Sequence, residues 1–436
     1  MVNRVFRGRG EIGSVDLEAT EQALREMGQR VGGGLLEKLL NAGAGIERAH
    51  VVCGQGHRAR FIDCRKKDVV TVVGTVKLER GYYHCAVCGE GVIPEDRELD
   101  IEDTSFSPGV RRMMGLVGAK EAFDEGRRDL QELSGVRVST KSLERASEGI
   151  GAAIEATVQQ EIELAMSDKL VWLKPGGPIK RMYISMDGTG VPVVSWETEG
   201  RKGKGPDGKA KTREAKLGCV FTQTGVDKEG KPVRDPHSTT YVGAIELAEE
   251  FGRRIYTEAV RRGVREAIEV VVMGDGALWI WNIAEKHFWG AIQIVDQYHA
   301  LEHLAGAGKA VFGLLNPKSK QWFDAHRGQL KDGDIKAVIR SLKRLRPSGA
   351  EEKEQIQREI DYFDRNRERM RYAEFRRRGL FIGTGVMEAG CKTLIGRRCK
   401  QSGMKWTVRG ANSIIALRCC QMSGRWESNW EARSAG

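Results

Sequence analysis

The chain has 436 residues, which is longer than a single hydrophobic core usually grows, so we expect several domains. It carries 71 Lys and Arg against 60 Asp and Glu, a formal net charge of +11. This excess, with no long apolar run in the sequence, favours nucleic acid over a membrane as the partner. The start at Met1 lacks the apolar stretch of a signal peptide, and nine cysteines suit reduced thiols, so we expect a cytoplasmic protein.

Residues 1–49 are predicted to form an N-terminal helical arm. Leucines and other apolar residues recur at helical spacing from about residue 16 to residue 40. Gly32, Gly33 and Gly34 interrupt this pattern, and consecutive glycines disfavour a helix. We therefore expect two helices with a break at the glycines.

Residues 50–100 are predicted to form a small zinc-binding β module. Two β-rich runs lie between a Cys53-x₃-His57 pair and a Cys85-x₂-Cys88 pair. Four such ligands on two short loops suit tetrahedral Zn²⁺. Cys64 competes with His57 for the fourth position.

Residues 101–168 are predicted to form a helical DNA-binding region. The stretch 121–134 has a helical pattern, 135–139 is turn-like, and a second helix follows from Thr140 to about Gly149. Helix-turn-helix units place the second helix in the major groove, where Lys141 and Arg145 would contact DNA. Two packed helices without a binding role are the alternative.

The remainder of the chain is predicted to be an α/β domain of the RNase H-like class with a helical insertion. Alternating and apolar runs predict three antiparallel strands, a helix, a strand, a helix and a strand. We expect the first part of the catalytic domain at 180–299 and the helical insertion at 300–379. The second part of the catalytic domain is expected at 380–425, followed by a C-terminal tail at 426–436.

Acidic residues follow the ends of several predicted strands. Asp187 ends the first strand, Asp275 follows the apolar strand 270–273, and Asp296 and His299 follow the last one. Glu388 lies on a late helix. Carboxylates gathered at strand ends can hold two Mg²⁺ ions, or Mn²⁺, against a phosphate, which indicates phosphoryl-transfer chemistry on a polynucleotide.

Four blocks carry a family resemblance, in an order that is more specific than any single Asp-Gly pair. They are Arg181-Met-Tyr-Ile-Ser-Met-Asp187, Val271-Val-Met-Gly-Asp275, Asp296-Gln-Tyr-His299 and Gly385-Val-Met-Glu388. The chain resembles bacterial insertion-sequence transposases of the DDE type, and the ISKra group among them, from about Cys53 to Trp406.

The resemblance implies a DNA transposase that cleaves and joins the ends of its element. Asp187, Asp275 and Glu388 match the triad that binds Mg²⁺, and Asp296 with His299 matches a further family signature. A Gly-Gln-Gly-His stretch after Cys53 is shared, which favours His57 over Cys64. Double-stranded DNA, as terminal inverted repeats and target, is the implied partner, bound by a homo-oligomer.

Basic residues near these positions are expected to contact DNA, although such runs are commonly only solvated faces. The tract 365–378 lies on the insertion, where it would clamp DNA near the active site, and a second tract follows Glu388. The candidates are Arg376, Arg377, Arg378, Arg397, Arg398 and Lys400.

Several alternatives remain open. One alternative is a transposase-derived DNA-binding protein without catalytic activity. Another is an RNase H-like nuclease that cuts DNA without joining it. A remote one is a zinc metalloprotease, because His299, Glu302 and His303 fit a His-x-x-Glu-His pattern. Asp296 alternatively caps the following helix, and Glu368 and Glu374 compete with Glu388.

Overall fold

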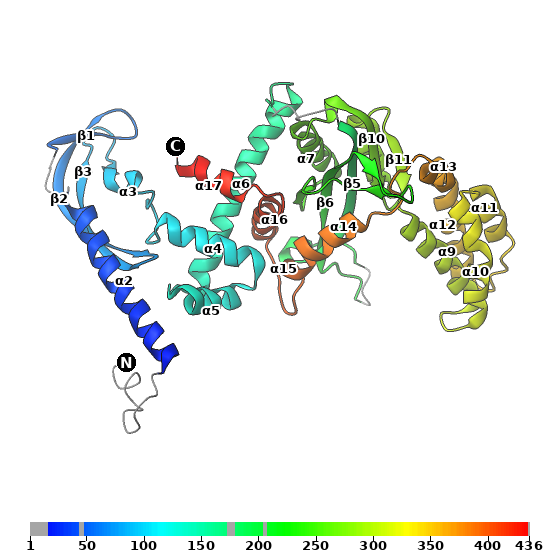
Figure 1. The fold of residues 1–436 in the computed structure, drawn as a ribbon, viewed down its shortest axis with the longest axis horizontal. Coiled ribbons are helices and arrows are strands. Elements are labelled where there is room, and N and C mark those ends of the chain that lie inside the picture. The colour runs from blue at the N-terminus through cyan, green and yellow to red at the C-terminus, as the bar shows by residue number, and fades with distance from the viewer. Residues whose placement is uncertain (1–15, 43–47, 172–178, 204–206, 435–436) are drawn as a thin grey trace. The chain divides into compact units, whose positions relative to one another are not determined.

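The computed structural model describes residues 16–42, 48–171, 179–203 and 207–434. Parts of the predicted N-terminal arm (1–15 and 43–47), including the start at Met1, and the last two residues of the predicted tail lie outside the described residues. The chain divides into two compact units, Met1–Ser147 and Glu148–Gly436. Figure 1 shows the elements of both units.

The first unit contains an antiparallel sheet of four strands in the order β1-β2-β3-β4. Its main feature is the long hairpin of β2 (Arg58–Thr71) and β3 (Gly74–His84), with β1 (His50–Val52) and β4 (Gly91–Val92) at the edges. The short helix α3 (Pro94–Glu98) follows β4. The predicted β module between the cysteine pairs is therefore present as a sheet.

Helix α2 (Leu17–Asn41) is a single helix, so the predicted break at Gly32-Gly33-Gly34 is wrong. The helix lies along the hairpin, with Leu36 and Leu40 packed against the buried residues of β2 and β3. A Cβ on Gly33 would lie 2.9 Å from the carbonyl oxygen of Val73 in the hairpin turn. The glycine thus allows a close approach that outweighs its poor helix propensity.

Helices α4 (Pro108–Lys120) and α5 (Phe123–Ser134) and the start of α6 (Thr140–Met166) complete the first unit. Gly135 ends α5 with a φ of 74°, and Ser139 caps α6 by accepting a hydrogen bond from the amide of Ser142 at 3.0 Å. The predicted helices and turn are confirmed as secondary structure, although α6 is 27 residues long and continues well past Gly149.

The second unit is built on a mixed sheet of five strands in the order β11-β10-β5-β6-β9. Strands β5, β6 and β9 are antiparallel neighbours, whereas β10 and β11 run parallel to β5. The five strands are β5 (Ile179–Pro192), β6 (Thr212–Gln223), β9 (Thr240–Ala244), β10 (Ala267–Gly274) and β11 (Ile292–Val295). Each predicted strand is present, and the mixed α/β class is confirmed. A separate small pair is formed by β7 (Gly225–Val226) and β8 (Pro232–Val233).

Helices cover this sheet, and α9 to α13 gather in one group beside it (Figure 1). The 3₁₀ helices are η1 (Ser195–Thr198), η2 (Val264–Glu266) and η3 (Arg367–Arg369). The α-helices are α7 (Ala248–Arg261), α8 (Leu278–His287), α9 (Gln297–Phe312), α10 (Pro317–Asp332), α11 (Ile335–Lys343), α12 (Ala350–Asn366), α13 (Tyr372–Arg377), α14 (Gly385–Gly390), α15 (Arg397–Cys399), α16 (Val408–Met422) and α17 (Trp426–Ser434). A π-helical turn, η4 (Cys391–Gly396), joins α14 to α15. Within the described residues no helix combines the length and the apolarity that crossing a bilayer requires.

Alanine substitution of two neighbouring glycines is expected to change stability in opposite directions. Gly34→Ala meets open space and should raise the free energy of unfolding by about 1 kcal/mol, since alanine favours the helix. Gly33→Ala should lower it by about 1 kcal/mol or more, because the new Cβ meets the Val73 carbonyl. Chemical denaturation measures both, and equal gains would contradict the tight helix–hairpin contact.

Candidate active site and candidate metal centre

Two of the predicted carboxylates lie side by side because of the register between β5 and β10. In this parallel pair, Met273 lies opposite Ser185. Asp187 and Asp275 each come two residues later, at the same end of neighbouring strands. Both side chains are half-buried. The sheet therefore places two acids at one edge, as the sequence predicts.

The environment of Asp187 is partly desolvated and already hydrogen-bonded. One carboxylate oxygen accepts a hydrogen bond from the amide of Gly188 at 2.7 Å, and the other accepts one from the Cys391 thiol at 3.4 Å. Burial raises the pKa of Asp187, the two hydrogen bonds oppose that rise, and the nearby charge of Asp275 adds to it. A cation bound here would relieve the cost of keeping both acids ionised.

Asp275 is held by a turn that the helical insertion supports. Its side chain accepts a hydrogen bond from the amide of Ala277 at 2.9 Å. Its backbone carbonyl accepts one from the hydroxyl of Tyr362 on α12 at 2.8 Å. Gly276 has a φ of 102°, and a Cβ there would lie 2.6 Å from the Tyr362 ring. The turn thus needs glycine, and Tyr362 fixes its position.

Asp296 is the N-cap of α9, which is the alternative interpretation of this residue. It is 0% exposed, and one oxygen accepts from the amides of Tyr298 and His299 at 2.6 and 3.1 Å. The other oxygen accepts from the amide and the hydroxyl of Thr384. Both oxygens are therefore used within the protein, and Asp296 joins the end of β11 to the segment that begins α14.

Glu388 lies on α14, which packs on the sheet beside β5 and β6. It is half-buried and lies three residues before Cys391, the residue that contacts Asp187. Three-residue spacing puts both side chains on one face of the helix. Among the described residues, the oxygens of Asp187, Asp275 and Glu388 do not all lie within 4.8 Å of one another, and the place of Glu388 in the triad stays a prediction.

The two histidines after Asp296 have separate surroundings. His299 lies close enough to Asp187 that it opposes in part the rise in the pKa of that acid caused by burial, and its Nδ1 lies 3.4 Å from Glu302. His303 instead pairs with Glu359 at 2.7 Å and stacks on the Tyr362 ring at a centroid distance of 3.7 Å. A zinc protease would require the ligand atoms of His299, Glu302 and His303 to lie close together. Within the described chain these three residues form no group of ligand atoms within 4.8 Å of one another.

The basic residues after Glu388 divide into exposed and buried ones. Arg397 and Lys400 are exposed, and the Lys400 ammonium contacts the hydroxyl of Thr189, two residues after Asp187. Arg398 is 0% exposed, with its guanidinium 4.9 Å from the centre of the Trp406 ring. The predicted DNA contact of Arg398 is therefore wrong, because a buried side chain cannot reach a phosphate.

Arginines 376 to 378 lie away from the carboxylates. Arg378 pairs at 2.6 Å with Glu269, near the start of β10, whereas Asp275 follows the end of that strand. Six extended residues separate these positions by about 20 Å. Arg376 and Arg377 are exposed, and Arg376 also donates to the carbonyl of Lys331. The expected position of Arg378 beside the active site is thus wrong, whereas the start of the tract follows Tyr362, which contacts Asp275. Contact of the tract with DNA stays a prediction.

Lys141 and Arg145 are exposed on the first turns of α6. Lys141 pairs with Glu144 at 2.9 Å, one turn further along the helix. An exposed ion pair of this kind is weak, so Lys141 could leave Glu144 and bind a phosphate instead. Their accessibility is compatible with the predicted DNA contact, which stays a prediction.

The first unit holds a preformed cluster of metal ligands. Among the described residues, a single group of three or more possible ligand atoms lies within 4.8 Å, and it consists of Cys53, His57, Cys85 and Cys88. The sulfurs of Cys53 and Cys88 are 3.7 Å apart. Cys64 is exposed on β2 and outside the group, so His57 rather than Cys64 lies with the three cysteines, as preferred from the sequence.

Two tight turns build this cluster. The amide of Cys53 donates to the His57 carbonyl at 2.8 Å, and the amide of Cys85 donates to the Glu90 carbonyl at 2.9 Å. Nδ1 of His57 is buried without a hydrogen-bond partner, as expected of a nitrogen that binds a metal. The Cys88 amide helps to lower the pKa of Cys85 to about 7. A tetrahedral ion such as Zn²⁺ fits this Cys₃His donor set.

Loss of a ligand in the cluster is expected to release the metal and to destabilise the first unit. Cys85→Ala should abolish stoichiometric zinc in the purified protein and raise its sensitivity to proteases, because zinc binding stabilises such small modules. Cys64→Ala is the matched control and should retain the zinc. Atomic emission measures the content; retention in Cys85→Ala, or loss in Cys64→Ala, would contradict the ligand set.

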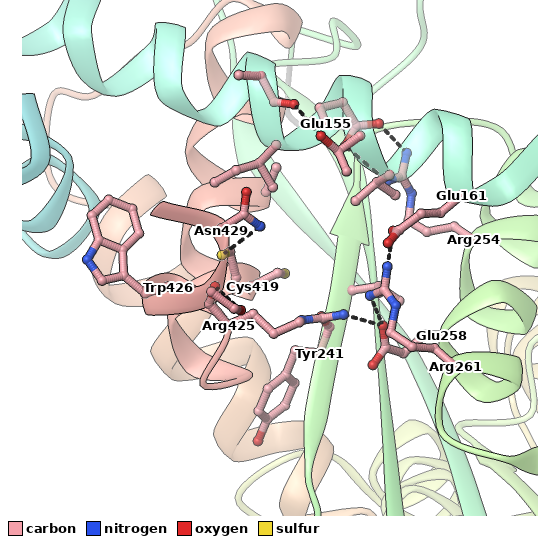
Figure 2. A pocket seen from close by; sticks show the side chains of 18 of the residues that line it. Glu155, Glu161, Tyr241, Arg254, Glu258, Arg261, Cys419, Arg425, Trp426 and Asn429 are labelled. Carbon is pink, nitrogen blue, oxygen red and sulfur yellow. Dashed lines mark hydrogen bonds and ion pairs between the residues drawn. The ribbon is translucent and has the colours of Figure 1, made fainter. Parts of the chain in front are cut away.

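A pocket of about 600 Å³ lies elsewhere in the second unit, between α6, α7, β9, α16 and α17 (Figure 2). Its charged residues pair with one another. Arg254 binds Glu155 at 2.6 Å, while Arg261 and Arg425 both bind Glu258, at 3.0 and 2.8 Å. None of the predicted acids lines this pocket. We therefore assign its ion pairs to fold stability, since they link α6, α7 and the segment before α17.

Removal of the Glu258 carboxylate is expected to destabilise the second unit. Glu258 is 2% exposed, and Glu258→Gln leaves two arginines without their shared partner, which should cost about 3 kcal/mol. Glu229→Gln breaks an exposed pair with Lys231 and should cost less than about 1 kcal/mol. Urea denaturation compares them, and equal small losses would show that the buried pairs contribute little.

Three residues of the candidate active site were missed by the sequence analysis. Cys391 follows Glu388 at helical spacing, a signal that was available. No sequence signal pointed to Tyr362 or Thr384, because Tyr362 lies 87 residues from its partner Asp275 and Thr384 lies 88 residues from its partner Asp296.

Comparison with known proteins identifies one similar curated protein and one similar solved structure. No family model matches the chain. A curated protein of Streptococcus gallolyticus, the UPF0236 protein in vanSb 3'region, is 24% identical over 345 residues, which cover 77% of this chain and 68% of that protein. The Drosophila P element transposase strand transfer complex aligns over 78% of this chain and 84% of that chain, with 11% sequence identity and a TM-score of 0.26.

Proposed function

We propose that the protein is a DNA transposase whose second unit is an RNase H-like catalytic domain. The observation that carries the proposal is the pairing of β5 with β10, which places Asp187 and Asp275 at the same sheet edge. The sheet order, with three antiparallel strands followed by two parallel ones, is the order expected for this class of fold. The ISKra-like blocks contain these same acids.

Asp187, Asp275 and Glu388 are the residues that would hold two Mg²⁺ or Mn²⁺ ions. Bound there, the ions would activate the attacking water or 3′-hydroxyl and stabilise the leaving oxygen. Half-buried carboxylates at a strand edge suit such ions, which take oxygen ligands and keep sites for water and phosphate. Because the three acids do not form a closed cluster, we infer that DNA phosphate completes the site.

The protein's other residues orient this centre. Tyr362 holds the turn of Asp275, and burial raises the pKa of its hydroxyl, which keeps it protonated as a donor. Asp296 holds Thr384 and thereby the start of the helix that carries Glu388. Lys400, beside Thr189, is placed to neutralise a phosphate near the acids. Asp296 is thus a positioning residue in this proposal.

The first unit would bind the ends of the element. A zinc-stapled hairpin and the α5–α6 pair, with Lys141 and Arg145 exposed, suit contact with double-stranded terminal repeats. The net charge of +11 supports an anionic partner. A nuclease that cuts without joining is the second candidate, because the same carboxylates serve hydrolysis.

Substitution of the strand-edge acids is expected to abolish cleavage without loss of DNA binding. Asp187→Asn and Asp275→Asn should each lower Mg²⁺-dependent cleavage of terminal-repeat DNA by roughly 1,000-fold or more, because each removes an ion ligand. Glu388→Gln should behave alike. Asp332→Asn, on the exposed end of α10, and Glu368→Gln are controls that should cut normally.

The same assay separates the candidate functions. Joined products with target DNA support transposition, cleaved ends without joined products support a nuclease, and binding without cleavage supports a non-catalytic protein. Wild-type cleavage rates in the Asp187→Asn or Asp275→Asn protein would overturn the site assignment.

A further inference from the structure

Helix α2 exposes a continuous apolar stripe along its length. Six large apolar side chains follow one another at intervals of 7, 3, 4, 4 and 4 residues. Their exposed fractions lie between 55% and 73%. They are Leu17, Leu24, Met27, Val31, Leu35 and Leu39. Such spacing keeps the side chains on one face of a helix, as in the seam of a helix pair.

The stripe cannot turn inward, because the opposite face of α2 is fixed to the β hairpin. Leu36 and Leu40 pack on the hairpin core. The Glu37 carboxylate accepts from the amide of Lys77 at 2.9 Å, and Asn41 bonds to the backbone of Lys77 and Glu79 at 2.8 and 3.0 Å. A helix held in this way leaves its outer face exposed.

Gly28 lies within the stripe, and no packing contact among the described residues explains a glycine there. Nothing lies within 4 Å of a Cβ placed there, in contrast to Gly33, which touches the hairpin. Glycine in a helix interior costs about 1 kcal/mol relative to alanine. A glycine on an apolar face allows another helix to approach closely, which gives this residue a purpose in a helix pair.

The stripe is complementary to itself in an antiparallel arrangement. A two-fold axis crossing the helix between Gln29 and Arg30 places Leu24 opposite Leu35 and Gly28 opposite Val31 of the second copy. The same axis places Glu21 opposite Lys38 on the border of the stripe, so opposite charges meet twice. A parallel pair would instead place each residue beside its own copy, Glu21 beside Glu21.

We propose that α2 forms an antiparallel homodimer with α2 of a second copy of this chain, in the absence of DNA. The partner is a second copy because the Leu24–Leu35, Gly28–Val31 and Glu21–Lys38 pairs all form about a single axis. The interface goes beyond the proposed function and does not depend on catalysis, so it stands or fails separately from the assignment of Asp187 and Asp275.

The association state of the full-length protein tests this interface. Sedimentation without DNA should show a dimer whose dissociation constant rises roughly 100-fold or more in Leu24→Glu or Leu35→Glu, because each puts two charges in an apolar seam. Leu133→Glu alters an even more exposed leucine, on α5, and should leave the dimer unchanged. Helix content and zinc content report whether each variant is folded.

Gly28 tests the close approach of the helices. Gly28→Leu should strengthen the isolated helix yet weaken the dimer by roughly 10-fold or more, because the side chain enters the crossing. Glu26→Leu adds the same side chain outside the stripe and should leave the dimer unchanged. A tighter dimer in Gly28→Leu would overturn the crossing at this residue.

Charge exchange tests the orientation. Glu21→Lys and Lys38→Glu should each weaken self-association, because like charges then meet across the axis, whereas a mixture of the two should form a heterodimer. The double variant should regain the wild-type dimer. A monomeric wild-type protein, or leucine variants that dimerise normally, would overturn the proposal and indicate that another molecule covers the stripe. Self-association of Glu21→Lys and Lys38→Glu as tight as that of the wild type would overturn the antiparallel arrangement, because a parallel pair already places like charges together.

Discussion

The parallel register between β5 and β10 is the constraint on which the candidate active site depends. Because Met273 lies opposite Ser185, two acids that are 88 residues apart in sequence leave neighbouring strands at the same level. A shift of one residue would turn one side chain to the other face of the sheet. The buried residues of both strands fix this register, so the hydrophobic core determines where the two acids lie.

Further contacts bring the rest of the site to this edge. The helical insertion supports Asp275 through Tyr362, and the cap residue Asp296 holds the start of α14 through Thr384. The Cys391 thiol then meets Asp187 from a π-helical turn. Turns of this type are frequent at functional sites, since the extra residue redirects side chains. The insertion thus helps to build the site as well as to extend the domain.

Local patterns in the sequence were sufficient for the strands and for the metal ligands. Alternation over 181–194, the apolar run 270–273 and the spacing of the Cys and His pairs depend on neighbouring residues alone. The predictions that proved wrong concern residues whose conformation or position depends on tertiary contacts. Gly33 is helical because the hairpin turn approaches it, Arg398 is buried under Trp406, and Arg378 is drawn to Glu269. No local pattern contains those partners.

The binding of ions by the strand-edge acids is the central claim, and diffraction at the manganese absorption edge tests it most directly. Crystals of the protein with Mn²⁺ and terminal-repeat DNA should show anomalous peaks within coordination distance of Asp187 and Asp275, with Glu388 as a further ligand. Peaks on DNA or at other acids, with none at Asp187 and Asp275, would contradict the account.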